Sequence, residues 1–82
     1  CAGDPWCEAI RQWGLPTPSG LSIAGKQLPL FWPAKGVLAV PGGASPELVN
    51  DAAALGILDV ISLPSNPGDQ APVELLSALG VS

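Results

Sequence analysis

A glycine-rich turn at residues 42–45 is the segment whose backbone could carry chemistry. Gly42, Gly43 and Ser45 follow an apolar run and precede a helix start at Pro46. Backbone N–H groups in such a turn, together with the positive end of a helix dipole, can hold an anion. The spacing matches neither GxxxxGK[ST] nor GxGxxG, nor the elbow that presents a nucleophilic serine. The alternative interpretation is an ordinary turn before a capped helix.

The chain lacks the side chains that other common catalytic sites require. The chain contains no histidine, so Ser–His–acid and Cys–His arrangements are excluded. Asp4 and Glu8 stand one helical turn apart, but a helix cap and a solvated face explain them without acid–base chemistry. The acids are scattered and the two cysteines isolated, which does not fit a metal site. We therefore expect no enzyme activity, no metal and no cofactor.

The two cysteines indicate the cellular compartment of the protein. Cys1 and Cys7 are the only two in the chain, and a disulfide between them would suit an exported protein. The start Cys1-Ala2-Gly3 also resembles that of a mature bacterial lipoprotein, whose cysteine carries lipid. Two free thiols in a cytosolic protein are the third alternative. We expect the bridge, and an extracellular or cell-envelope location, but the sequence does not separate a bridged Cys1 from a lipidated one.

Three tryptophans are the largest side chains of the chain. Trp6 and Trp13 share one helical face with Ile10, which predicts that they lie in the core. Trp32 follows Phe31 between two short strands, where a loop would be exposed. Tryptophan is enriched at interface hot spots. We therefore expect Trp32, with Phe31, to contact a partner.

Local signals predict the elements that position these residues. Asp4 and Pro5 indicate a helix start, and Gly14 its end. A hairpin over residues 21–31 turns at Gly25, and Pro29 predicts that its second strand lies at a sheet edge.

A strand over residues 36–40, a helix ending at residue 55 and a strand over residues 57–63 form a right-handed βαβ unit. The inner side of that middle helix is predicted to carry Leu48, Val49, Ala52, Ala53 and Leu55. In a last helix over residues 72–79, the residues predicted to face inward are Val73, Leu76 and Leu79. We expect one α/β or α+β domain over residues 1–82, a small mixed sheet with one βαβ unit and two to three short helices.

Composition indicates a partner. Hydrophobic residues make up 48% of the 82 residues and charged residues only 12%, about half the usual charged share of roughly 25%. A small domain must then expose apolar surface, which usually marks an interaction site. The net charge of −4, with three basic residues, argues against nucleic acid. The longest apolar run, residues 28–40, is interrupted and too short to span a membrane.

Three functions follow as hypotheses. The first is a non-catalytic exported binding or assembly domain, such as a subunit of an extracellular or viral structure, which binds a protein partner or itself. The second is a secreted effector, toxin or inhibitor that acts on one protein target through Trp32 or the loop at residues 15–20. The third is a small anion-binding protein or enzyme that uses the turn of Gly42, Gly43 and Ser45.

Overall fold

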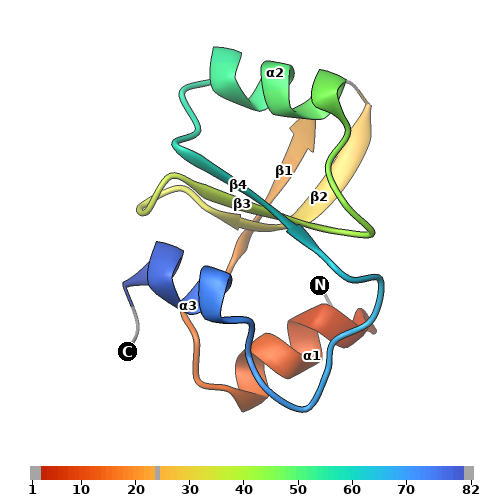
Figure 1. The fold of residues 1–82 in the computed structure, drawn as a ribbon, viewed down its shortest axis with the longest axis vertical. Coiled ribbons are helices and arrows are strands. Elements are labelled where there is room, and N and C mark those ends of the chain that lie inside the picture. The colour runs from red at the N-terminus through yellow and green to blue at the C-terminus, as the bar shows by residue number, and fades with distance from the viewer. Residues whose placement is uncertain (1–2, 24, 81–82) are drawn as a thin grey trace.

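Within residues 3–23 and 25–80 the chain forms three helices and four strands (Figure 1). The computed structural model describes residues 3–23 and 25–80. The helices and strands, in chain order, are α1 (Pro5–Gln12), β1 (Ser19–Ile23), β2 (Lys26–Trp32), β3 (Val37–Pro41), α2 (Pro46–Ala54), β4 (Asp59–Leu63) and α3 (Val73–Leu79).

The strands form one mixed sheet in the order β1-β2-β3-β4, so chain order and sheet order agree. β1 with β2 and β2 with β3 are antiparallel, whereas β3 and β4 are parallel. Helix α2 covers one face of the sheet, and α1 and α3 lie on the other (Figure 1). The predicted α+β architecture, with β3-α2-β4 as its βαβ unit, is confirmed.

Helix starts follow the local chemistry of the sequence. The Asp4 carboxylate accepts from the Trp6 N–H at 2.8 Å, and the Ser45 hydroxyl accepts from the Leu48 N–H at 3.2 Å. Each cap is followed by a proline at the first helical position, where the missing N–H removes nothing. Helix α3 begins after Pro72 and has no side-chain cap. The position of α3 is therefore determined by its packing against the rest of the domain.

The prediction that Pro29 makes its strand an edge strand is wrong, because β2 lies inside the sheet. The register of β1 with β2 shifts by one residue beside it, so that Pro29 and Leu30 both lie opposite Gly20. On its other side β2 pairs with β3 only through Phe31 and Trp32. Proline, which cannot donate a ladder hydrogen bond, is accommodated in this bulge.

Two apolar clusters fill the spaces between the layers. The α2-side cluster consists of Ile23, Leu28, Leu38, Val40, Leu48 and Ala52. The larger α1/α3-side cluster consists of Trp6, Ile10, Leu15, Leu30, Trp32, Val37, Ala39, Ile61, Leu63, Leu75 and Leu79.

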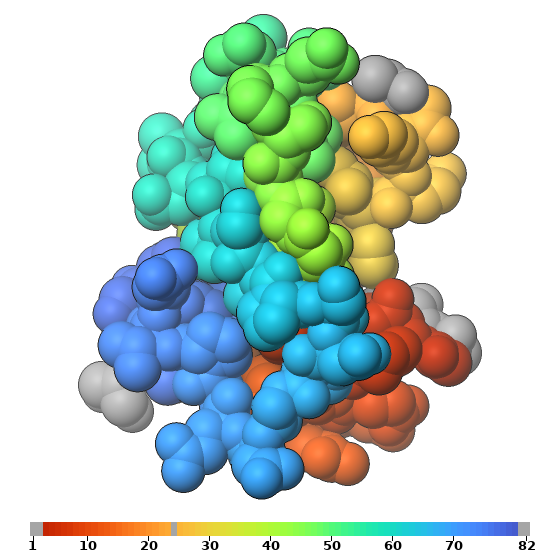
Figure 2. All heavy atoms as spheres, turned by 45° about the vertical axis from the view of Figure 1, so that its right-hand side comes forward, coloured from red at the N-terminus to blue at the C-terminus, as the bar shows by residue number. Residues whose placement is uncertain are grey.

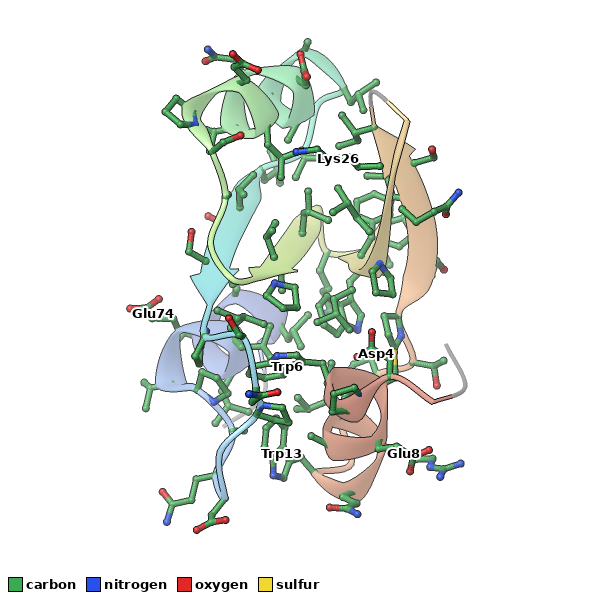
Figure 3. All side chains as sticks on the ribbon, turned by 90° about the vertical axis from the view of Figure 1, so that its right-hand side faces the viewer. Asp4, Trp6, Glu8, Trp13, Lys26 and Glu74 are labelled. Atoms are coloured by element: carbon green, nitrogen blue, oxygen red, sulfur yellow. The ribbon has the colours of Figure 1, made fainter. Side chains whose placement is uncertain are left out.

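Indole hydrogen bonds tie two loops to the larger cluster. Trp6 Nε1 donates to the Pro64 carbonyl at 3.1 Å, in the loop after β4. Trp32 Nε1 donates to the Pro16 carbonyl at 2.8 Å, in the loop before β1. Trp13 is half-buried and meets Trp6 edge-on, with ring centroids 6.1 Å apart (Figure 3). Trp6 thus lies in the core, as predicted, whereas Trp13 is half-buried and flanks the core.

The inward faces of two helices differ in part from the prediction. In α2 the buried residues are Leu48 and Ala52. The other three predicted inward residues, Val49, Ala53 and the C-cap Leu55, are exposed. In α3 the buried residues are Leu75 and Leu79, and Val73 is 76% exposed. Each helix buries one narrow stripe of residues four apart, because each contacts only one face of a four-stranded sheet.

Candidate functional site

The outer edge of β4 is open. β4 is the last strand of the sheet, and within residues 3–23 and 25–80 no strand pairs with its outer side. The Asp59 N–H donates to the Gly36 carbonyl at 3.0 Å, and the Leu63 carbonyl accepts from Gly42 at 2.8 Å, both toward β3. Backbone groups of alternating strand residues point to opposite sides. The N–H and C=O groups of Val60 and Ser62 therefore point outward, where another chain could pair with them.

Leu58 stands immediately before this edge. Its side chain is 81% exposed, the largest value among the large hydrophobic residues that the structure describes. Its backbone is nevertheless fixed, since the N–H groups of Leu58 and Asp59 both donate to the Gly36 carbonyl, at 2.9 and 3.0 Å. Gly36 has a φ of +67°, and a Cβ there would lie 3.0 Å from Leu58 Cγ. The glycine thus lets a leucine lie against the turn while it stays open to solvent.

Two further exposed apolar residues accompany Leu58. Leu55, at the end of α2, is 61% exposed, and Val73, at the start of α3, is 76% exposed. Residues 55–58 and α3 lie on the same side of the molecule (Figure 2). Single exposed hydrophobic residues are common, but three in the segments that flank β4 in the chain or border it make this side of the molecule unusually apolar. We call Leu55, Leu58, Val73 and the edge of β4 the β4 surface.

A groove between β4 and α3 borders the β4 surface. It is lined by Asp59, Ile61, Val73, Glu74, Ser77 and Ala78. Ile61 is buried and supplies an apolar floor, whereas the carboxylates of Asp59 and Glu74 are exposed. Glu74 points outward from α3 in Figure 3. Within the described part of the chain the one salt bridge joins Arg11 to Glu8 at 2.8 Å, so neither groove carboxylate is paired with a base.

A second hollow lies beside α1. It has a volume of about 350 Å³ and is lined by Cys7, Glu8, Ile10, Arg11, Leu15, Thr17 and Pro18. Most of its lining is apolar, and the Glu8–Arg11 pair stands at its rim. The loop that closes it, residues 15–18, belongs to the segment expected to contact a target.

The prediction that Trp32 is exposed in a loop is wrong. Trp32 is the last residue of β2 and is only 3% exposed, since its indole fills the α1/α3-side cluster. Phe31 points to the other face of the sheet, where it is half-buried against the α2-side cluster. Trp32 is therefore not a protruding contact, because the strand continues to it and the turn begins only after it.

The turn at residues 42–45 uses its amides internally. Gly42 donates to the Leu63 carbonyl at 2.8 Å, Gly43 to the Val40 carbonyl at 3.2 Å, and Ala44 to the Ser62 hydroxyl at 3.0 Å. The Ser45 hydroxyl caps α2. An anion would have to displace these bonds, so the geometry favours the ordinary turn over the anion cradle. Gly42 and Gly43, at φ +86° and +96°, give the turn its shape.

The predicted disulfide joins Cys7 of α1 to Cys1. Cys1 lies outside the described residues, and Cys7 is half-buried on α1, against the α1/α3-side cluster. Over the described ranges no helix has the length and apolar character needed to cross a membrane. No group of three metal-ligating side chains occurs in the same ranges.

Comparison with known proteins gives no relative. No family model, no curated protein and no solved structure matches this chain.

Proposed function

We propose that this chain is a non-catalytic, exported binding domain that contacts another protein through the β4 surface. The observation that carries the proposal is Leu58, an 81% exposed leucine on a backbone fixed by two hydrogen bonds at the start of an open strand edge. Covering apolar surface contributes about 25 cal/mol per Å². The outward groups of Val60 and Ser62 would add the directional hydrogen bonds of an added strand. A subunit role in an extracellular or viral structure is the assembly form of this proposal.

Selection of random displayed peptides tests this proposal without a known partner. Peptides selected on the wild-type domain are expected to lose binding to the double variant Leu58→Ser, Val73→Ser. They should keep binding to Val49→Ser, the matched control, because Val49 is exposed on α2. Circular dichroism should show all three proteins folded, since none of these side chains is buried. Peptides that bind the double variant as well as the wild type would overturn the proposal.

A second candidate function rests on the hollow beside α1. A monomeric effector or inhibitor could hold an apolar side chain of its target among Ile10, Leu15 and Pro18. The same selection separates the two functions. Peptides that survive the Leu58→Ser, Val73→Ser change but lose binding to Pro18→Ser would favour this second function.

Export is tested by the mass of the natively produced chain. We expect a mass lower than the sequence mass by two hydrogen atoms, because Cys1 and Cys7 would be oxidised to a disulfide in an exporting compartment. Reduction before the measurement should restore the sequence mass. A lipid adduct on Cys1 would instead make the protein a membrane-anchored lipoprotein. The sequence mass without reduction would contradict the bridge.

A further inference from the structure

We propose that the occupant of the β4 surface is an extended segment of a different protein that carries Lys or Arg at alternate residues. This inference rests on the proposed function and names its partner chemistry. It combines the open backbone of β4, the carboxylates of the β4–α3 groove and the absence of a matching segment in this chain itself.

The open backbone sets the shape of the partner. Val60 and Ser62 offer two N–H and two C=O groups on the outer side of β4, which only an extended chain can pair in sequence. β4 has five residues, so a partner of similar length covers it. Side chains of an added strand alternate between the two faces of the sheet.

The groove determines the charge of the partner's side chains on one of those faces. Side chains of an added strand that point to the α3 side would pass Asp59 and Glu74 and reach Ile61 and Ala78. A Lys or Arg side chain fits this lining, because its aliphatic stem covers apolar surface and its head meets a carboxylate. Neither carboxylate is paired with a base of the described chain. Lys35 stands one residue before Gly36, near the start of β4, and does not line the groove.

The other face of the added strand meets apolar residues. Leu55 ends α2, the helix that covers this side of the sheet, and Leu58 lies between α2 and β4. Apolar side chains at the alternate positions of the partner would cover them. The partner pattern is therefore basic and apolar in strict alternation over about five residues, the length of β4.

A second copy of this chain does not have that pattern. Its two edge strands, β1 with the sequence SGLSI and β4 with DVISL, contain no Lys or Arg. Two β4 edges brought together would also join two acidic grooves without a base between them, in a chain of net charge −4. Like charges across a contact oppose association. Charge complementarity thus favours a foreign basic strand over self-association.

Two designed peptides test the charge. The basic peptide is acetyl-TKVRVKT-amide and the acidic one acetyl-TEVEVET-amide, which have the same length and alternation. Titrated into the ¹⁵N-labelled domain at low salt, the basic peptide should shift the amide signals of Val60 and Ser62. The acidic peptide should leave them in place. Added salt should weaken the binding of the basic peptide, because partly exposed charge pairs are screened.

Two charge-matched double variants test whether the groove carboxylates bind the basic peptide. The double variant Asp59→Asn, Glu74→Gln should bind the basic peptide with an affinity about tenfold lower, on the scale of two partly exposed ion pairs. Glu47→Gln with Asp51→Asn removes the same net charge from exposed positions on α2 and should change the affinity less than about twofold.

The outcomes separate this inference from the proposed function. Equal binding of both peptides at Val60 and Ser62 would overturn the basic-strand inference and leave the β4 surface as a binding site. A particle mass that is a multiple of 8.2 kDa, and that falls to one chain in Leu58→Ser, would replace the foreign strand by a second copy. No shift at β4 with either peptide, together with displayed peptides that ignore Leu58, would overturn both proposals.

Discussion

Trp32→Ala is expected to lower the free energy of unfolding by about 3–5 kcal/mol, the usual cost of removing a large buried aromatic side chain. The indole is 3% exposed and packs in the α1/α3-side cluster. Its Nε1 also holds the Pro16 carbonyl at 2.8 Å, so the loop before β1 loses an anchor. A domain of 82 residues has about 4–12 kcal/mol in total. The variant should therefore lose a large share of its stability and unfold at a much lower urea concentration than the wild type.

Urea unfolding followed by circular dichroism measures this loss. Phe31→Ala is the neighbouring control, because Phe31 is only half-buried on the other face of the sheet, and its midpoint should fall less. A Trp32→Ala protein with wild-type stability would contradict the buried indole and return Trp32 to the exposed contact role that the sequence indicated.

Leu75→Ala is expected to cost about 2–5 kcal/mol, whereas Val73→Ala, two residues earlier in the same helix, should change stability by about 0.5 kcal/mol or less. Leu75 is fully buried in the α1/α3-side cluster, and Val73 is 76% exposed beside the groove. Helix propensities of Val, Leu and Ala differ by less than about 0.7 kcal/mol, so propensity alone cannot produce the difference. Thermal and urea unfolding of the two variants, measured side by side, give the comparison.

The opposite ranking would show that α3 is rotated. If Val73→Ala proved the more costly change, the helix would present the face that the sequence predicted, Val73 with Leu76 and Leu79. The groove and the β4 surface would then lose Val73. The pair thus checks the geometry on which the proposed binding site depends.

Local signals predicted most of the fold because they act over a few residues. The caps at Asp4 and Ser45, the turn at Gly25 and the strand–helix–strand order around α2 all appear where the sequence placed them. In each case a hydrogen bond or a φ angle within one turn of chain decides the structure.

The errors concern choices that only tertiary packing makes. In α3, the residues Val73, Leu75, Leu76 and Leu79 are all apolar, and a helix of two turns can bury either of two stripes. The inward stripe is set by where the helix docks. Pro29 was predicted at an edge, but a bulge accommodates it within the sheet. The sequence predicts Trp32 in a loop because Pro33 follows it directly, but β2 continues through Trp32 and ends just before the proline.

The β4 surface was missed for a related reason. The sequence predicts a strand over residues 57–63, in which Leu58 counts as one more β-forming residue. The strand begins at Asp59, and Leu58 is left in the connection. That β4 is an edge strand follows from the order of all four strands, which no local pattern encodes. The isolated acids Asp59 and Glu74 gave no signal, since 15 residues separate them and the fold alone brings both to one groove.

The α1/α3-side cluster joins the first helix of the chain to the last, through Trp6 and Ile10 at one end and Leu75 and Leu79 at the other. During synthesis the hairpin and the βαβ unit can form as they leave the ribosome, because their contacts are local. The larger half of the core cannot close until the last helix has emerged. A nascent chain that ends before α3 would expose the indole of Trp6 and the face of the sheet on which α1 and α3 lie. Folding of this small domain is therefore expected to be completed, cooperatively, only after α3 has emerged, and deletion of α1 or α3 is expected to open the core.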